Sequence, residues 1–268
     1  MFNILKISSY SVCSKKIERA FNNFIIVQLS DLHGRVFAYE YKQILTWLGR
    51  LHPDIVVLTG DIADNRLKRS TANAELLCGL ITSRFQTYFV VGNHEQTMKP
   101  DELKSFLDHL GNMGVRNLNN KKCVVKKGSA EIVLSGLVTP LKFYNDPFHE
   151  HQRKSFFGLE DMSNLLDNAE KKYYNILLAH NPIFFNTYSK WGADLVLSGH
   201  MHGGVICIPG VGGLLSPDVT ILPKYYAGEY ERMDSRMIVS RGLNNRFPFS
   251  ISNPSEIVCV KLKSGDIE

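Results

Sequence analysis

The sequence predicts a single α/β domain. Its 268 residues suit one large domain of this class or two small ones, and the alternation of buried-strand and amphipathic-helix patterns favours one. Five apolar, β-branched runs are each followed by a short polar cluster, as expected where strands of a sheet end. Apolar residues make up 44% of the chain, which is enough to build a substantial core around such a sheet.

The alternation is clearest in the first half of the chain. Each expected strand is a short apolar run, and each expected helix carries its apolar residues at helical spacing. Pro100 and Gly111 are typical of the two ends of a helix. In order, we expect strand 24–29, helix 39–51, strand 55–58, helix 72–81, strand 87–91 and helix 100–111.

The second half departs from this alternation. Two runs separated by Lys-Gly-Ser, 123–126 and 131–134, predict a β-hairpin. Residues 1–22 are interpreted as an N-terminal extension, 139–157 as a surface loop or flap, and 205–268 as a C-terminal β meander. Between them we expect helix 159–171, strand 175–178, a short helix 182–190 and strand 194–197.

Composition narrows the function classes. The five cysteines are scattered and form no C-x-x-C, which favours a reducing compartment and argues against a disulfide framework. No signal-peptide core or membrane-spanning run is found, so we expect a cytoplasmic protein with at most peripheral membrane contact. The net charge of +5 is compatible with anionic partners, but no basic, aromatic-rich run predicts a nucleic-acid groove.

The polar clusters carry the side chains that bind divalent metal ions. Carboxylate oxygens and imidazole nitrogens suit Mn, Fe, Zn and related ions, and ligands gather at the carboxyl ends of strands in α/β folds. Two ions roughly 3.5–4 Å apart can hold both the attacking and the leaving oxygen of a displacement. Asp61, alone after its strand, suits the role of a bridging carboxylate. The candidate ligands are Asp31, His33, Asp61, Asn93, His180, His200 and His202.

These clusters, in their order, resemble a known family. The motifs D-x-H, G-D-x-x-D, G-N-H-E, A-H-N and G-H-x-H-G-G are similar to those of the calcineurin-like metallophosphoesterase superfamily, from residue 29 to about residue 242. The resemblance implies a four-layer α/β/β/α sandwich with mixed sheets and two divalent metal ions. Mn is favoured, with Fe, Zn, Ni and Co as alternatives.

The resemblance also implies residue roles. His94 would protonate the leaving oxygen or stabilise charge on the phosphoryl group during attack by a metal-bridged hydroxide. The two ions would share Asp61. One ion would be held by Asp31, His33, Asp61 and His202, and the other by Asp61, Asn93, His180 and His200.

The C-terminal part is similar to the bacterial branch of YkuE- and YaeI-type phosphodiesterases, near which UDP-2,3-diacylglucosamine hydrolases also occur. Two features depart from that branch: no membrane or export segment precedes the motifs, and Val205 stands where Gln is common after His-Gly-Gly. The first departure argues against membrane anchoring in this chain. The second concerns loop hydrogen bonding and leaves the candidate ligands unchanged.

Several residues have a structural interpretation beside the functional one. Asp64 is expected to orient or cap rather than to bind metal, and Arg241 either contacts a substrate phosphate or pairs with a carboxylate. The segment 206–215 is either a hydrophobic wall or a packed turn. We assign no chemistry to four histidines and interpret one cysteine as a small buried residue: His52, His109, His149, His151 and Cys207.

The sequence therefore predicts a metal-dependent phosphoesterase acting on a phosphodiester, a pyrophosphate or a phosphomonoester. The substrate would be a phosphorylated small molecule or a lipid-linked one. The alternatives are a UDP-2,3-diacylglucosamine-type pyrophosphate hydrolase or phospholipid-directed phosphodiesterase, a nuclease, and an inactive scaffold of the same fold. The inactive scaffold is disfavoured because every candidate ligand and His94 are present.

Overall fold

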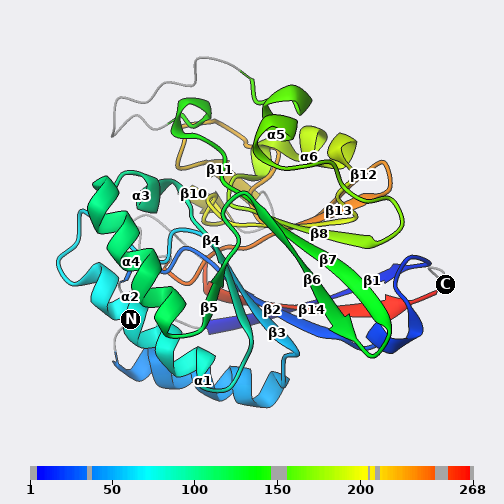
Figure 1. Ribbon diagram of the computed structural model, residues 1–268. Helices are drawn as coiled ribbons and strands as arrows, with labels where there is room; N and C mark the ends of the chain where they lie inside the picture. The colour runs from blue at the N-terminus through cyan, green and yellow to red at the C-terminus, as the bar shows by residue number, and fades with distance from the viewer. Residues whose placement is uncertain are drawn as a thin grey trace.

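Two six-stranded sheets face each other with helices on both outer sides, as Figure 1 shows for the computed structural model of the protein. This arrangement confirms the predicted α/β/β/α sandwich with mixed sheets. The structure describes residues 5–34, 38–145, 156–204, 206–208, 212–244 and 253–265.

The first sheet has the strand order β1-β14-β2-β3-β4-β5. It is mixed, because β14 runs antiparallel to β2 whereas the other neighbours are parallel. Its strands are β1 (Leu5–Ser14), β2 (Ile25–Leu29), β3 (Ile55–Thr59), β4 (Thr87–Val90), β5 (Val115–Asn117) and β14 (Ser255–Ser264). The helices packed on its outer face are α1 (Ala38–Leu51), α2 (Ser70–Thr82) and α4 (Pro100–Asn112).

The second sheet has the order β12-β13-β9-β8-β7-β6, with parallel pairing from β13 to β7 and antiparallel pairs at both edges. Its strands are β6 (Lys121–Lys127), β7 (Ala130–Leu137), β8 (Tyr174–Ala179), β9 (Leu195–Ser198), β12 (Gly228–Arg232) and β13 (Ser235–Val239). The helices α5 (Leu159–Leu165) and α6 (Phe185–Trp191) pack on its outer face.

Shorter elements complete the described chain. The strands β10 (Ile206–Ile208) and β11 (Gly212–Leu215) form a separate antiparallel hairpin, so the apolar segment 206–215 adopts β structure on both sides of residues 209–211, which lie outside the described ranges. The remaining helical turns are α3 (Asn93–Gln96), η1 (Arg19–Phe21), η2 (Leu141–Phe143) and η3 (Pro182–Phe184).

The strand β3 shows why the strands are continuous apolar runs. Ile55 and Val57 point into the core between the two sheets, whereas Val56 and Leu58 pack against the helices. All four side chains are buried, because a parallel strand in the middle of a sandwich has two covered faces. The strand is therefore anchored on both sides directly before Asp61.

The N-terminal residues differ from the prediction. The segment 1–22 was expected to be an extension, but Leu5–Ser14 forms β1, which pairs in parallel with β14 over its whole length. Its sequence, LKISSYSVCS, contains no continuous apolar run, and only Ser8 and Val12 are buried. Tyr10 and Val12 pack on one core cluster and Leu5 and Ile7 on the other, so both faces of this edge strand are partly covered.

The C-terminal residues also differ from the predicted meander. The pairs β10–β11 and β12–β13 are antiparallel hairpins, but β13 then joins β9 in parallel. The final strand, β14, crosses to the other sheet and lies between β1 and β2. Ile257, Val258 and Val260 are fully buried, because this strand has neighbours on both edges and covered faces.

Two segments in the middle of the chain also differ from the prediction. The helix expected at 159–171 ends at Leu165, because the next residue is extended and backbone carbonyls beyond it bond to other elements. Trp191 Nε1 donates to the Asp167 carbonyl at 3.1 Å, and Lys122 Nζ donates to the Asn168 carbonyl at 2.6 Å. The expected surface loop 139–157 has both buried and exposed residues at its described ends: Tyr144 and Phe157 are buried, whereas Lys142 and Phe156 are exposed. Residues 146–155 lie outside the described ranges.

Because β14 links β1 to the rest of the sheet, truncating its buried side chains should destabilise the fold. Leu262, which is buried and faces Val12 in the β1–β14 register, is a suitable site. Leu262→Ala should lower the free energy of unfolding by about 2–5 kcal/mol in urea denaturation. The control Val124→Ala, at a 45% exposed position in β6, should change it by less than about 0.5 kcal/mol. Equal effects would show that β14 is not part of the core.

Candidate metal centre

The polar clusters lie at the carboxyl ends of five parallel strands. Three of these strands, β2, β3 and β4, belong to the first sheet, and β8 and β9 belong to the second. Asp31, Asp61 and Asn93 follow the first three, and His180 and His200 follow the other two. Carboxyl ends of parallel strands are where α/β folds gather ligands. The two sheets therefore contribute jointly to one site.

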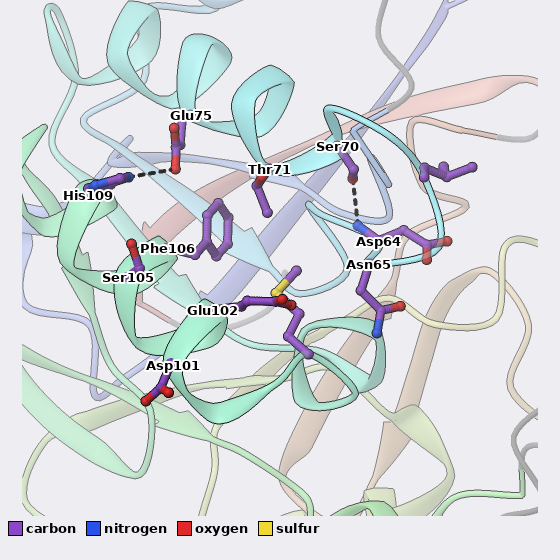
Figure 2. A pocket seen from close by; sticks show the side chains of 12 residues that line it. Asp64, Asn65, Ser70, Thr71, Glu75, Asp101, Glu102, Ser105, Phe106 and His109 are labelled. Carbon is purple, nitrogen blue, oxygen red and sulfur yellow. Dashed lines mark hydrogen bonds and ion pairs between the residues drawn. The ribbon is translucent and has the colours of Figure 1, made fainter.

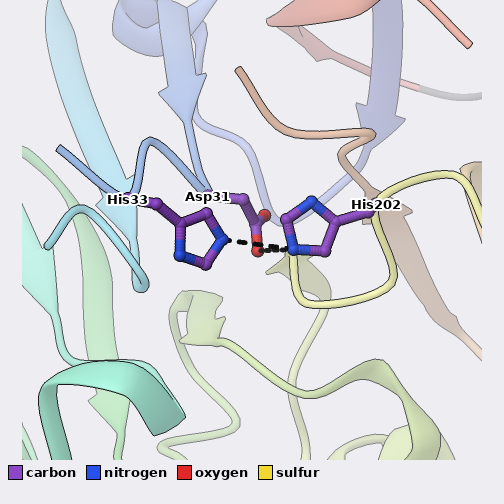
Figure 3. A group of neighbouring side chains, drawn as sticks. All are labelled: Asp31, His33 and His202. Atoms are coloured by element: carbon purple, nitrogen blue, oxygen red, sulfur yellow. Dashed lines mark hydrogen bonds and ion pairs between the residues drawn. The ribbon is translucent and has the colours of Figure 1, made fainter. Parts of the chain in front are cut away.

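Asp31, His33 and His202 form the first group of potential ligands (Figure 3). His202 Nε2 lies 3.5 Å from Asp31 Oδ1 and 3.3 Å from His33 Nε2. All three residues are buried. One ligand atom from each lies within 4.8 Å of the others, which is close enough for a shared ion.

Asp61, His180 and His200 form the second group. His180 Nε2 lies 3.1 Å from Asp61 Oδ2 and 4.0 Å from Asp31 Oδ1, so the two groups are adjacent. His180 Nδ1 lies 2.6 Å from the Thr59 carbonyl oxygen, which fixes the ring and turns Nε2 toward the carboxylates. Each group contains three of the four residues of one predicted ligand set; Asp61 is missing from the first group and Asn93 from the second.

Asn93 and His94 begin α3, directly after β4. The backbone N–H of His94 donates to Asp61 Oδ1 at 2.9 Å, and its ring Nε2 lies 3.7 Å from Asp61 Oδ2. Asn93 is buried, and its Oδ1 has no hydrogen-bond partner among the described residues. The helix start thus places one amide oxygen and one imidazole beside the second group.

Asp64 and Arg66 hold His94 from the other side. Asp64 Oδ1 lies 3.5 Å from His94 Nδ1, and Arg66 Nη2 donates to Asp64 Oδ2 at 2.7 Å. The same Nη2 lies 3.1 Å from His94 Nδ1. Burial opposes protonation, but Asp61 and Asp64 raise the pKa of His94 above its ordinary value. Asp64 also forms a third group of potential metal ligands with His33 and His94. Arg66 is a neighbour of His94 that the sequence did not indicate.

The donor atoms fit divalent metal ions. Burial, reinforced by neighbouring histidines, lowers the pKa of His33 and of His200 well below the usual value, so both rings are neutral and keep a lone pair. Although burial opposes ionisation, His180 and His94 hold the pKa of Asp61 well below its ordinary value. His200 Nε2 is a second buried atom without a hydrogen-bond partner among the described residues. Oxygen and nitrogen donors of this kind suit Mn, Fe or Zn.

The backbone at the site is unusual. Five candidate ligands have positive φ angles, in the left-handed region that L-residues other than glycine seldom adopt. Such a conformation costs about 1–2 kcal/mol per residue, so the surrounding structure must enforce it. The φ angles are 54° at Asp31, 52° at His33, 53° at Asp61, 69° at His200 and 50° at His202.

Glu95 holds the loop that carries Asp61. Its Oε2 accepts the N–H groups of Asp61 at 2.9 Å and Gly92 at 2.8 Å, and its Oε1 accepts that of Ala63 at 3.0 Å. Burial and the charge of Asp61 raise the pKa of Glu95 to about 7 despite these three donors. Gly60 permits the close packing, because a Cβ there would lie 2.6 Å from His180 Nδ1. Glu95 is the last residue of the G-N-H-E motif, whose sequence alone does not indicate this role.

Arg241 lies behind the loop that carries His202. Its Nη1 donates to Asn253 Oδ1 at 3.1 Å, and its Nε lies 4.0 Å from Glu256 Oε1. Asn253 in turn donates to the His202 carbonyl. In this structure Arg241 is therefore an amide- and carboxylate-paired residue that supports the loop. The contact of Asn253 was not predicted, since nothing in its sequence context marks it.

A cleft of about 560 Å³ lies between α2 and α4 beside the site (Figure 2). Asp64 lines one end of it, and His109, which pairs with Glu75 at 3.0 Å, lines the other. Asp101 and Glu102 add two more carboxylates. Three of these carboxylates have a basic neighbour: Arg66 beside Asp64, His109 beside Glu75 and Lys99 beside Glu102. The lining of the cleft includes none of the seven candidate ligands.

Two of the remaining residues named from the sequence, His52 and Cys207, lie within the described ranges. His52 is exposed and Cys207 is buried. His149, His151 and Val205 lie outside the described ranges. Tyr144, which was not singled out, packs edge-on against His200 with ring centroids 5.1 Å apart.

A two-sheet sandwich with buried Asp, Asn and His side chains at its strand ends is typical of the metallophosphoesterase class. The model of the calcineurin-like phosphoesterase family matches residues 24–204, and the chain belongs to this family. Its members depend on a dinuclear metal centre.

Relatives of similar length support the same family. The metallophosphoesterase YkuE of Bacillus subtilis is 26% identical over 266 residues, which cover 98% of this chain and 87% of the relative. A metallophosphoesterase of Aquifex aeolicus is 28% identical over 264 residues, covering 97% and 92%.

A solved structure shows the same fold. The NAD nucleotidase of Haemophilus influenzae aligns with a TM-score of 0.54 at 15% identity, over 82% of this chain and 45% of that one.

Among the described residues no helix is both long and apolar enough to span a membrane.

Because three backbone N–H groups converge on Glu95, its loss should loosen the Asp61 loop. Glu95→Gln keeps the shape but turns an NH₂ group toward one of those donors, which leaves it unpaired. Metal affinity measured by calorimetry should fall by about 10–100-fold. The matched control Glu102→Gln, whose side chain is 58% exposed on α4, should bind metal like the parent protein. Unchanged affinity in both variants would exclude this role for Glu95.

Proposed function

We propose that the protein is a metal-dependent phosphoesterase that hydrolyses a phosphodiester or pyrophosphate, or a phosphomonoester, at the site formed by the loops after β2, β3, β4, β8 and β9. The observation that carries this proposal is the adjacency of the two buried ligand groups, with His180 Nε2 3.1 Å from Asp61 Oδ2 and 4.0 Å from Asp31 Oδ1. Buried carboxylates so close together need cations to balance them. Two divalent ions, with Mn favoured, would satisfy both groups.

The first ion would be held by Asp31, His33 and His202, the second by Asn93, His180 and His200, and Asp61 would serve both. When bound, the two ions supply positive charge for the phosphoryl oxygens and lower the pKa of a water nucleophile. The protein contributes rigid placement, since Glu95 and the positive φ angles hold the aspartates and histidines before any ion binds.

His94 is the residue that would move a proton. Its Nε2 faces Asp61 and its Nδ1 faces Asp64, while the nearby Arg66 guanidinium opposes protonation of the ring. Asp61 and Asp64 favour the protonated ring, which can donate to a leaving oxygen or stabilise charge on the phosphoryl group. Arg66 is about half exposed and adds a guanidinium at the edge of the site, where it can also contact an anionic substrate.

The charge of the cleft and the candidate ligands argue against two alternative functions, a nuclease and an inactive scaffold. A nuclease needs a basic path for a polynucleotide, whereas the cleft beside Asp64 is lined by carboxylates. An inactive scaffold would not need five candidate ligands with left-handed backbone angles. A hydrolase of UDP-diacylglucosamine type or a phospholipid-directed phosphodiesterase remains the second candidate, and the surface features described below favour a lipid-linked substrate.

Removing one ligand should abolish activity without unfolding the protein. Asp61→Asn and His200→Ala should each reduce hydrolysis of bis-p-nitrophenyl phosphate by at least about 100-fold, since the charge-stabilising centre is lost. Bound metal, measured by inductively coupled plasma mass spectrometry, should fall in parallel. The control His109→Ala, a 55% exposed side chain outside the site, should retain both. Undiminished turnover in Asp61→Asn would place the active site elsewhere.

The role of His94 can be separated from metal binding by the choice of leaving group. An alkoxide needs protonation as it leaves, whereas p-nitrophenolate does not. His94→Ala should therefore slow hydrolysis of an alkyl ester by about 10²–10⁴-fold and that of the p-nitrophenyl ester by much less. Equal losses on the two substrates, with metal content unchanged, would contradict an acid role.

A further inference from the structure

The loop that joins β11 to β12 turns its apolar side chains outward. We call residues 216–224 the 216–224 loop. Val219, Ile221 and Leu222 are 52%, 77% and 64% exposed, whereas Ser216 and Asp218 are buried. A loop on the surface of a soluble protein normally has the reverse arrangement, so an outward apolar set of this kind indicates a contact surface.

Hydrogen bonds inside the loop enforce this arrangement. Ser216 Oγ donates to the Asp218 carboxylate and accepts the N–H of Thr220 at 3.0 Å. The N–H of Leu222 bonds to the Leu214 carbonyl at 2.8 Å, which ties the loop to β11. Val219 and Leu222 have φ angles of 59° and 49°, which bulky side chains rarely adopt. The polar groups of Ser216 and Asp218 are thus hydrogen-bonded within the loop. The strained backbone at Val219 and Leu222 turns the apolar side chains toward solvent.

The 216–224 loop is connected to the metal centre on two sides. Asn145 Nδ2 donates to the Asp218 carbonyl at 3.0 Å, and the preceding residue, Tyr144, packs against His200. In β11, a Cβ at Gly213 would lie 3.3 Å from the Gly203 carbonyl, directly after His202. A partner that binds the 216–224 loop would therefore lie next to the metal centre.

The charges around the loop favour an anionic surface. The only carboxylate within residues 216–224, that of Asp218, is buried, so it adds little negative charge to the outer side. Lys224 and Lys142 are exposed, the first at the end of the loop and the second three residues before Asn145. Exposed aliphatic side chains beside lysines are the pattern by which proteins insert into the interface of anionic membranes.

We propose that the 216–224 loop inserts Val219, Ile221 and Leu222 into the surface of an anionic lipid membrane, so that the metal centre acts on a phosphate ester in a lipid headgroup. The choice of substrate rests on the phosphoesterase function proposed above, whereas membrane binding does not require hydrolysis.

Vesicle co-sedimentation tests the binding directly. Vesicles of phosphatidylcholine with about 30% phosphatidylglycerol should bind the protein, and pure phosphatidylcholine vesicles should bind it more weakly. The double substitution Ile221→Ser with Leu222→Ser should weaken binding by at least about tenfold, because two inserted side chains are lost. Both side chains are exposed in the free protein, so the variant should melt at the parent temperature.

A matched control removes equally exposed side chains elsewhere. Leu76→Ser with Met233→Ser changes positions that are 54% and 74% exposed, on α2 and in the β12–β13 turn, and should leave vesicle binding unchanged. No binding by the parent protein, or the same loss in both double variants, would overturn the proposal. A parent dimer that the Ile221/Leu222 variant converts to a monomer would also overturn it, by showing that the loop contacts a second copy.

Two further measurements keep the membrane proposal separate from the proposed activity. The Ile221/Leu222 variant should hydrolyse bis-p-nitrophenyl phosphate like the parent but lose activity on phospholipid in vesicles. Asp61→Asn should bind the vesicles as the parent does while hydrolysing neither substrate. Loss of soluble-ester activity in the loop variant would show a packing role and contradict the proposal. If the parent hydrolyses no ester yet binds vesicles, the phosphoesterase function fails while membrane docking stands.

Discussion

The structure depends on accommodating two carboxyl groups, those of Asp31 and Asp61, that are buried away from water. Asp31 is 0% exposed and Asp61 is 1% exposed, and a buried charge is costly unless cations and hydrogen-bond donors surround it. His180 lies within 4.0 Å of both. Backbone N–H groups of His200 and His94 complete the donors, one from each sheet. The two buried carboxyl groups can therefore be compensated only where the carboxyl ends of strands from both sheets meet.

The sandwich makes that meeting rigid. Gln28, fully buried in β2, donates from Nε2 to Thr59 Oγ1 and to the Ser198 carbonyl, both at 2.8 Å. Thr59 ends β3 of the first sheet and Ser198 ends β9 of the second, so one side chain joins the sheets directly beneath the ligands. Strands buried on both faces cannot shift to relieve the left-handed φ angles beyond them. Rigid packing below the site thus sustains strained geometry within it.

The sequence predicted the parts of this arrangement that local pattern controls. Buried parallel strands are continuous apolar runs, and ligand-type residues such as Asp31 or His200 stand out immediately after them. The strand β1 was missed because it is only partly buried and has no continuous apolar run, and the position of β14 was missed because pairing across the whole chain leaves no local mark. Glu95 and Asn253 act through backbone groups distant in sequence. Contacts of that kind follow from the fold, and spacing alone does not specify them.

The two ends of the site differ in charge, and this difference constrains how a substrate can lie. At the end of His33 and His94, Asp64 leads into a cleft lined by Glu75, Asp101 and Glu102, which repels anions. Arg66 pairs with Asp64 and Lys99 with Glu102, which offsets part of this negative charge. At the end of His200, Tyr144 leads instead to the 216–224 loop, whose outer side is apolar and flanked by lysine. A phosphate ester with an apolar or membrane-bound substituent would therefore direct that substituent toward the loop, with its phosphate over the buried carboxylates and their cations.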